Sequence, residues 1–85
     1  MQIISYLATP NDGEKARLLS CLQSMDYCEA FGAENKDLII LVTDTPNEPT
    51  EKKLQQQLKA LPALQNLSMA YGHSEHSNPH NSQEQ

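Results

Sequence analysis

The sequence predicts one small α+β domain whose strand and helix segments follow the order βαββαβ, with both helices on one face of a four-stranded antiparallel sheet. Three observations lead to this prediction. A chain of 85 residues holds one domain with a modest core. Two short segments are apolar at nearly every position, as expected of central strands. Each is followed by a proline-containing turn and then by apolar residues at helical spacing.

The first strand is predicted at residues 3–8, which are rich in β-branched and aromatic side chains. Thr9 is a candidate helix cap with Pro10 at the first helical position, and Asn11 is an alternative cap. The helix that follows has one apolar stripe at spacings of three and four residues. The stripe comprises Ala16, Leu19, Leu22 and Met25, with Leu18 and Cys21 beside them.

A hairpin follows the first helix. Residues 28–33 have a weaker strand pattern, in which a glycine and an acidic residue indicate a sheet edge or a bulge. The polar segment 34–37 is predicted to form the turn. Residues 38–43 are the strongest strand pattern in the chain and are apolar on both faces, so they are predicted to be the second central strand.

The second helix is predicted at about residues 48–61, and Pro62 ends it. Its apolar stripe comprises Leu54, Leu58 and Leu61. The last strand, near residues 64–71, alternates larger apolar residues with polar or small ones, so one of its faces is expected to be buried.

Two βαβ halves joined in this order give the ferredoxin-like fold. Right-handed crossovers place strands one and three in the centre of the sheet, which then has the order 4-1-3-2. The domain is predicted to span residues 1–73. Residues 74–85 contain no large apolar side chain and are predicted to be a disordered polar tail that contains histidines.

Charge and hydropathy exclude several classes of function. The net charge of −5 repels phosphate backbones, so nucleic acid is not expected as a partner, whereas a basic peptide would be attracted. No apolar run approaches the ~20 residues of a membrane span, and the N-terminus lacks the pattern of a secretory signal. We therefore expect a cytoplasmic protein without a membrane span. Cys21 and Cys28 are expected to be reduced, with a disulfide, redox chemistry or metal binding as the alternatives.

No arrangement of residues predicts catalysis. The three glycines are isolated and form no phosphate-binding loop, and every histidine lies at or beyond position 73, far along the chain from both cysteines. His73, His76 and His80 have spacings at which imidazoles bind metal ions, but their segment has no apolar anchor, so a polar tail is favoured over a metal site. We predict no enzyme activity, no catalytic residue, no cofactor and no metal.

The sheet face without helices is predicted to be the functional surface. The residues assigned to the helix side are Ile4, Tyr6, Leu38, Ile40, Val42, Leu67, Met69 and Tyr71. The residues then left on the other face are Ile3, Leu7, Ile39 and Leu41, beside Ser5, Thr43, Ser68 and Ala70. The inverse assignment stays open. In either case several aliphatic side chains are exposed together, which is typical of a contact site. The alternatives are a second copy of the chain on this face, strand propensity alone, or an extended peptide along strand two.

Four segments carry a resemblance to a known family. They are Ile3-Ile4-Ser5-Tyr6-Leu7, Cys28-Glu29-Ala30, Leu38-Ile39-Ile40-Leu41-Val42, and Ser68-Met69-Ala70-Tyr71 followed by His73 and Glu75. With these segments the chain, over about residues 2–75, resembles the NapD family of small cytoplasmic chaperones for the assembly of periplasmic nitrate reductase. Family members tend to have Gly before the Cys-Glu or Val-Glu pair, where this chain has Tyr27, and an adjacent Tyr-His, where Gly72 intervenes here.

The resemblance implies a chaperone that binds the twin-arginine (Tat) signal peptide of the catalytic subunit, a molybdoenzyme, and delays export until the cofactor is inserted. The basic and apolar parts of such a peptide suit an apolar sheet face rimmed by acids. The residues predicted to bind it are Ile3, Ser5, Leu7, Ile39, Leu41, Ser68 and Ala70 on the sheet, with Glu29 and Asp44 near the arginines. A monomer or weak homo-oligomer is expected. The alternatives are a regulatory or small-ligand-binding domain that dimerises through its sheet, and a metal-handling protein that uses the histidines.

Overall fold

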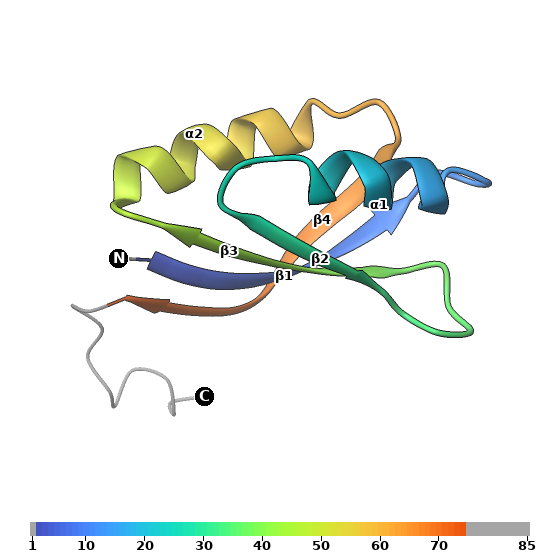
Figure 1. The fold of residues 1–85 in the computed structure, drawn as a ribbon, viewed down its shortest axis with the longest axis horizontal. Coiled ribbons are helices and arrows are strands. Elements are labelled where there is room, and N and C mark those ends of the chain that lie inside the picture. The colour runs from blue at the N-terminus through green and yellow to red at the C-terminus, as the bar shows by residue number, and fades with distance from the viewer. Residues whose placement is uncertain (1, 75–85) are drawn as a thin grey trace.

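A computed structural model describes residues 2–74 and contains four strands and two helices there (Figure 1). In chain order the elements are β1 (Gln2–Pro10), α1 (Lys15–Gln23), β2 (Cys28–Gly32), β3 (Ile39–Thr45), α2 (Glu48–Lys59) and β4 (Leu64–Ser74). This order is the predicted βαββαβ. The predicted polar tail beyond Ser74, with His76 and His80, lies outside the described residues.

The sheet is antiparallel and has the order β2-β3-β1-β4, which is the predicted order 4-1-3-2 read from the other edge. β1 and β3 are the two central strands, as their apolar patterns predicted. Figure 1 shows α1 and α2 on the same side of the sheet. No described element covers the other side, which we call the open face. The fold is therefore the predicted ferredoxin-like α+β arrangement.

The core lies between the helices and the sheet. Its buried apolar residues are Ile4, Tyr6, Ala8, Leu18, Leu22, Ala30, Ile39, Leu41, Leu54 and Leu58. Leu54 and Leu58 come from the predicted stripe of α2, and Leu61 is half-buried beside them. α1 turns Leu18 and Leu22 inward, whereas Ala16, which was predicted to lie in the stripe, is exposed. Within residues 2–74, neither helix is long and apolar enough to cross a membrane.

The predicted start of α1 was wrong. Thr9 and Pro10 continue β1, and the helix begins only at Lys15, with no side-chain cap at Glu14. The pairing of β1 with β3 ends at Ala8, so Pro10 lies where β3 requires no N–H donor. The side chain of Asn11, the alternative cap, instead donates to the carbonyl of Pro62 at 2.9 Å. It therefore joins the start of the β1–α1 turn to the end of the α2–β4 turn.

The predicted face assignment of β3 was also wrong. Ile39 and Leu41 are fully buried on the helix side, and Ile40, which was assigned to that side, is 41% exposed on the open face. Val42 is half-buried on the open face beside it. Met69 of β4 pairs with the buried Tyr6, which agrees with its assignment to the helix side, although it is 56% exposed next to a register shift in the β1–β4 pairing. The same shift places the backbone of Tyr71 opposite Ser5.

A buried carboxylate explains why β3 has this orientation. Glu51 of α2 is 2% exposed and accepts hydrogen bonds from the hydroxyls of Thr43 and Thr45, at 2.9 and 2.8 Å, and from the Tyr6 hydroxyl. Because both threonines must face α2 to reach Glu51, Ile39 and Leu41 face α2 as well. Burial raises the pKa of Tyr6, and its hydrogen bond to Glu51 raises it further. Gln55 completes the network by donating to the Tyr6 hydroxyl at 2.8 Å.

Polar contacts fix the ends of α2 and of the hairpin. The side chain of Asn47 caps α2 by accepting from the backbone N–H of Thr50 at 2.9 Å and from its hydroxyl at 2.7 Å. The ammonium group of Lys15 donates to the carbonyls of Ala33 and Lys36, at 2.5 and 2.6 Å, and so ties α1 to the β2–β3 turn.

Candidate functional site

The strand registers arrange the open face in three rows, because directly paired residues of antiparallel strands share a face. The first row contains Ser68, Leu7, Ile40 and Phe31; the second contains Ser5, Val42 and Glu29; the third contains Ile3 and Asp44. Each row crosses β1 and β3, and the first reaches all four strands. The open face is therefore one continuous surface formed mainly by the two central strands.

The first row is strongly apolar. Leu7 is 36% exposed, Ile40 is 41% exposed and Phe31 is 55% exposed, although each is a large hydrophobic side chain. These three side chains are neighbours across β1, β3 and β2. Together they form what we call the apolar row. A contiguous apolar patch of this kind on a small domain marks a contact surface.

The other two rows border a hollow of about 440 Å³. Its lining residues are Ile3, Tyr27, Cys28, Glu29, Val42 and Asp44. We call this space the open-face hollow. Glu29 and Asp44 are both exposed there, beside the aliphatic side chains of Ile3 and Val42. The hollow thus joins two carboxylates to an apolar lining, an arrangement suited to a cation with an apolar stem or neighbour.

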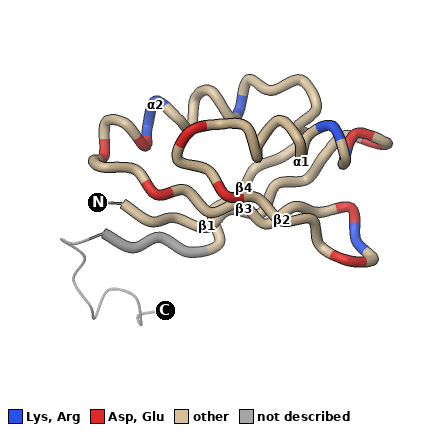
Figure 2. The backbone as a smooth tube through the Cα atoms, viewed as in Figure 1, with Lys and Arg blue, Asp and Glu red and all other residues tan. Residues whose placement is uncertain are grey.

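The positive charges of the chain lie elsewhere. All six Lys and Arg residues belong to α1, α2 or the β2–β3 turn, as Figure 2 shows. They are Lys15, Arg17, Lys36, Lys52, Lys53 and Lys59. The ion pair found among the described residues joins Arg17 to Glu14, at 3.2 Å and on α1. No Lys or Arg therefore neutralises Glu29 or Asp44, and the hollow presents a negative surface.

Cys28 is a potential nucleophile next to the hollow, but its side chain shares the face of Thr43 and packs against the core. Burial raises the pKa of its thiol to about 11, and the negative charges of Glu51 and Asp26 contribute to this increase. The neutral thiol therefore predominates at neutral pH, whereas a reactive cysteine requires the thiolate. Cys21 and Cys28 are both free thiols. The described part of the chain also has no group of His, Cys, Asp and Glu residues placed to hold a metal ion.

Tyr27 lies at the rim of the open-face hollow with an unusual backbone. Its φ of 69° is in the left-handed region, which a residue with a Cβ disfavours, and its side chain is 50% exposed. This is the position at which the resembling family tends to have glycine.

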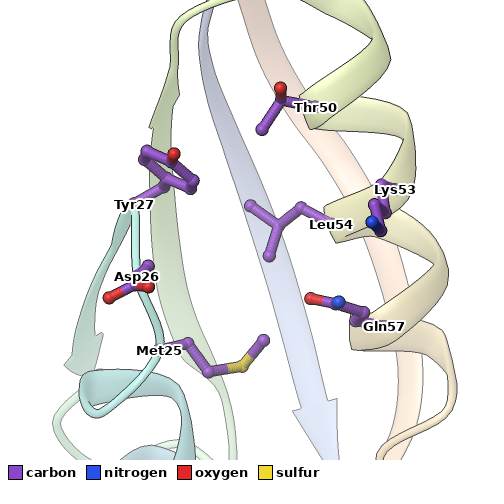
Figure 3. Close-up of a pocket in the computed structure, with 7 residues that line it drawn as sticks. All are labelled: Met25, Asp26, Tyr27, Thr50, Lys53, Leu54 and Gln57. Carbon is purple, nitrogen blue, oxygen red and sulfur yellow. The ribbon is translucent and has the colours of Figure 1, made fainter.

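A second hollow, of about 410 Å³, lies on the helix side (Figure 3). Its lining residues are Met25, Asp26, Tyr27, Thr50, Lys53, Leu54 and Gln57. Figure 3 shows Met25 and Leu54 extending into it from opposite sides. Asp26 and Lys53 bring charges of both signs to its lining, so it has no clear preference for a charged partner. The two hollows share only Tyr27 among their lining residues.

The edge of β2 is partly covered. Tyr27 and Ala33 are backbone partners of Asp44 and Leu38, and hydrogen-bonded pairs alternate along an antiparallel ladder. The backbone groups of Cys28, Ala30 and Gly32 therefore point away from β3. Gln23 already donates to the carbonyl of Ala30, at 3.2 Å. An extended peptide along this edge would have to compete with that contact, which favours the open face as the binding surface.

The structure brings most of the predicted site residues together. Ile3, Ser5 and Leu7 lie on the open face of β1, and Ser68 lies opposite Leu7 on β4. Glu29 and Asp44 line the same hollow as Ile3. Ala70 is exposed at the β4 register shift, next to this surface.

Ile39 and Leu41 do not belong to this surface, because both are fully buried in the core. The prediction missed Ile40, Val42, Phe31 and Tyr27. A signal for Phe31 was available, since it stands two residues after Glu29 and must share its face within a strand. The position of Tyr27 was noted only as a departure from the family pattern.

Comparisons with known proteins agree with the fold. No family model and no curated protein matches the sequence. Among solved structures, the chain has the fold of the E. coli Tat proofreading chaperone protein NapD, determined in solution. The two share a TM-score of 0.74 at 13% sequence identity, over 89% of this chain and 81% of the other. The resemblance seen in the sequence is confirmed at the level of the fold.

Proposed function

We propose that this protein is a cytoplasmic chaperone that holds the twin-arginine signal peptide of an exported molybdoenzyme, the catalytic subunit of periplasmic nitrate reductase, until its cofactor is inserted. The observation that carries the proposal is the open-face hollow. Glu29 and Asp44 lie there beside aliphatic side chains, on a face with no Lys or Arg. The shared fold with a Tat proofreading chaperone supports the same function.

The chemistry of the peptide matches the arrangement of the face. A guanidinium group donates up to five hydrogen bonds in a planar fork that fits carboxylates, so an arginine suits Glu29 and Asp44. The apolar stretch of a signal peptide suits the apolar row formed by Leu7, Ile40 and Phe31. Exposed ion pairs contribute only about 0 to 1 kcal/mol each. We therefore expect apolar contact to supply most of the affinity and the carboxylates to supply specificity.

This function is one of holding, in which no bond is made or broken. The thiol of Cys28 is kept neutral by its raised pKa, and the carboxylates serve as acceptors for a bound cation. Release of the peptide then requires only that contacts on the open face be lost. A surface assembled from strands already hydrogen-bonded to one another is suited to this role, because little of it must be ordered when the peptide binds.

Calorimetric titration tests the proposal. A twin-arginine signal peptide is titrated into the wild-type protein and into the Glu29→Gln, Asp44→Asn double variant at low salt. We expect binding by the wild type and about a tenfold weaker affinity in the double variant. Glu48→Gln is the matched control, because Glu48 is an exposed acid on α2 and should leave the affinity unchanged. Absence of wild-type binding at tens of micromolar peptide would contradict the proposal.

A homodimer that senses a small ligand is the second candidate, because a second copy would also cover the apolar row. It predicts a stable dimer in sedimentation experiments, which substitution of Phe31 by Glu would dissociate. The chaperone predicts that this substitution weakens peptide binding in a monomer. The 55% exposure of Phe31 is the observation that favours both candidates, so sedimentation separates them.

A further inference from the structure

The buried carboxylate of Glu51 has no cationic partner among its hydrogen-bond contacts. All its recorded partners are hydroxyl groups: those of Tyr6, Thr43 and Thr45. Because the Tyr6 hydroxyl accepts from Gln55, its own proton is directed to Glu51. An ionised carboxylate only accepts, so three converging donors are the pattern of the charged form. The position in the first turn of α2 also favours a negative charge.

This charge lies behind the open-face hollow, on the other side of the sheet. Thr43, which bonds to Glu51, stands between Val42 and Asp44 in β3, and both of these line the hollow. Cys28 is directly opposite Thr43 in the ladder, so its side chain lies on the helix side, like Glu51, and packs against the core. Only the thickness of the sheet therefore separates Glu51 from the hollow. The negative charge of Glu51 contributes to the raised pKa of Cys28 on the helix side of the sheet.

We propose that Glu51 acts as a third carboxylate of the open-face hollow. Its negative charge attracts a bound arginine through the sheet, although Glu51 does not contact the arginine. This inference rests on the proposed binding of a basic peptide and adds a specificity residue to it. A charge buried behind the sheet is shielded from dissolved ions much more than Glu29 and Asp44 are. Glu51 therefore preserves selectivity for a basic segment at salt concentrations that weaken the surface carboxylates. Its bonds to Thr43, Thr45 and Tyr6 keep it in position.

Salt dependence separates this role from that of the surface acids. Calorimetric titration with a twin-arginine peptide is carried out at ~0.05 M and ~0.5 M salt, where the screening lengths are about 14 and 4 Å. We expect Glu51→Gln to weaken binding about threefold to tenfold at both concentrations. The loss in the Glu29→Gln, Asp44→Asn double variant should shrink at high salt. Glu48→Gln, in the same turn of α2 but exposed, should bind like the wild type at high salt.

A purely structural role for Glu51 makes different predictions. Tyr6→Phe removes one hydrogen bond to Glu51 but leaves its charge, so it should lower the melting temperature while the peptide affinity stays within about twofold. A second readout tests whether Glu51 is charged: the pH dependence of Cys28 alkylation in a Cys21→Ser background, because the Cys28 side chain faces the same side of the sheet as Glu51. Glu51→Gln should lower the pKa of Cys28 below its value of about 11, whereas Glu48→Gln should not. The change in the pKa of Cys28 shows that Glu51 is charged, and the peptide affinity of Glu51→Gln shows whether this charge acts at the hollow.

Two results would overturn the inference: equal peptide affinity of the wild type and the Glu51→Gln variant at both salt concentrations, or an unchanged pKa of Cys28 in that variant. A loss of affinity in Tyr6→Phe as large as that in Glu51→Gln would also overturn it, because the effect would then follow the network and not the charge. Failure of the proposed function is a separate outcome. It would appear as absence of binding by the wild type itself.

Discussion

Tyr27 combines a disfavoured backbone with an exposed ring. A residue with a Cβ is destabilised by about 1 to 2 kcal/mol in the left-handed region, whereas glycine is not. Tyr27 keeps this backbone conformation because the chain turns there from α1 into β2. Its carbonyl accepts a hydrogen bond from the backbone N–H of Asp44 at 2.9 Å. A strained residue with an exposed aromatic side chain at the rim of a hollow is more readily explained by contact with a partner than by stability.

Replacement of Tyr27 by glycine is therefore expected to stabilise the fold. The free energy of unfolding should rise by about 1 kcal/mol, because glycine adopts a φ of 69° without the steric cost. Chemical denaturation monitored by circular dichroism measures the change. Tyr27→Ala is the control, since it removes the ring but keeps the Cβ. A Tyr27→Gly variant no more stable than Tyr27→Ala would show that the backbone at this position is not strained.

The position of β3 in the sheet was predicted correctly, but which of its faces is buried was predicted wrongly. Its apolar run and its central position in the sheet were predicted from sequence. Alternation could not fix its orientation, because residues 38–42 are apolar at every position. The orientation of β3 is set by Thr43 and Thr45, whose hydroxyls bond to Glu51 of α2. The alternation of residues along a strand does not predict such a contact between a helix and the sheet.

The sequence of α2 contained a signal for the contact of Glu51 with the sheet. Glu51 stands three residues before Leu54 and seven before Leu58, so it occupies a position of the apolar stripe. An acid at such a position predicts a buried polar partner.

The predicted start of α1 was wrong for a different reason. Thr9 and Pro10 have the local chemistry of a helix start, but pairing of β1 with β4 extends the strand through both residues. Long-range pairing outweighed the local preference.

Adjacent residues of β3 test its orientation. Leu41→Ala removes a fully buried side chain and should lower the free energy of unfolding by about 2 to 5 kcal/mol. Ile40→Ala shortens a side chain on the apolar row and should cost at most about 1 kcal/mol, while weakening the binding of the signal peptide. Urea titration and calorimetry measure the two effects. Equal destabilisation by both substitutions would contradict the assigned faces.

At the scale of the whole molecule, the positive charges and the apolar row lie on different sides. The helix side and the β2–β3 turn carry every Lys and Arg, and the open face carries Glu29, Asp44 and the apolar row. This segregation favours one orientation of approach for a basic partner and disfavours docking on the helices. The described residues that line the open-face hollow all lie within residues 3–44.

A protein that ends at Ser74 is therefore expected to keep its function. All six elements end at or before Ser74, and the described lining residues of the open-face hollow precede it. The shortened chain should retain its circular dichroism spectrum and bind a twin-arginine peptide within about threefold of the full chain, a difference below ~0.7 kcal/mol. Metal titration of both chains is the accompanying control for a histidine-dependent role. Loss of peptide binding on shortening would place part of the site beyond Ser74.

The three rows of the open face differ along the direction of β1. The end that contains Ile3 and Asp44 is acidic, and the end that contains Leu7, Ile40 and Phe31 is apolar. Such a surface has polarity in the vectorial sense, so it sets the direction in which a bound chain lies along β1. A segment whose arginines precede its apolar stretch can match both ends at once, whereas the same residues in reverse order would have to bind with the opposite chain direction.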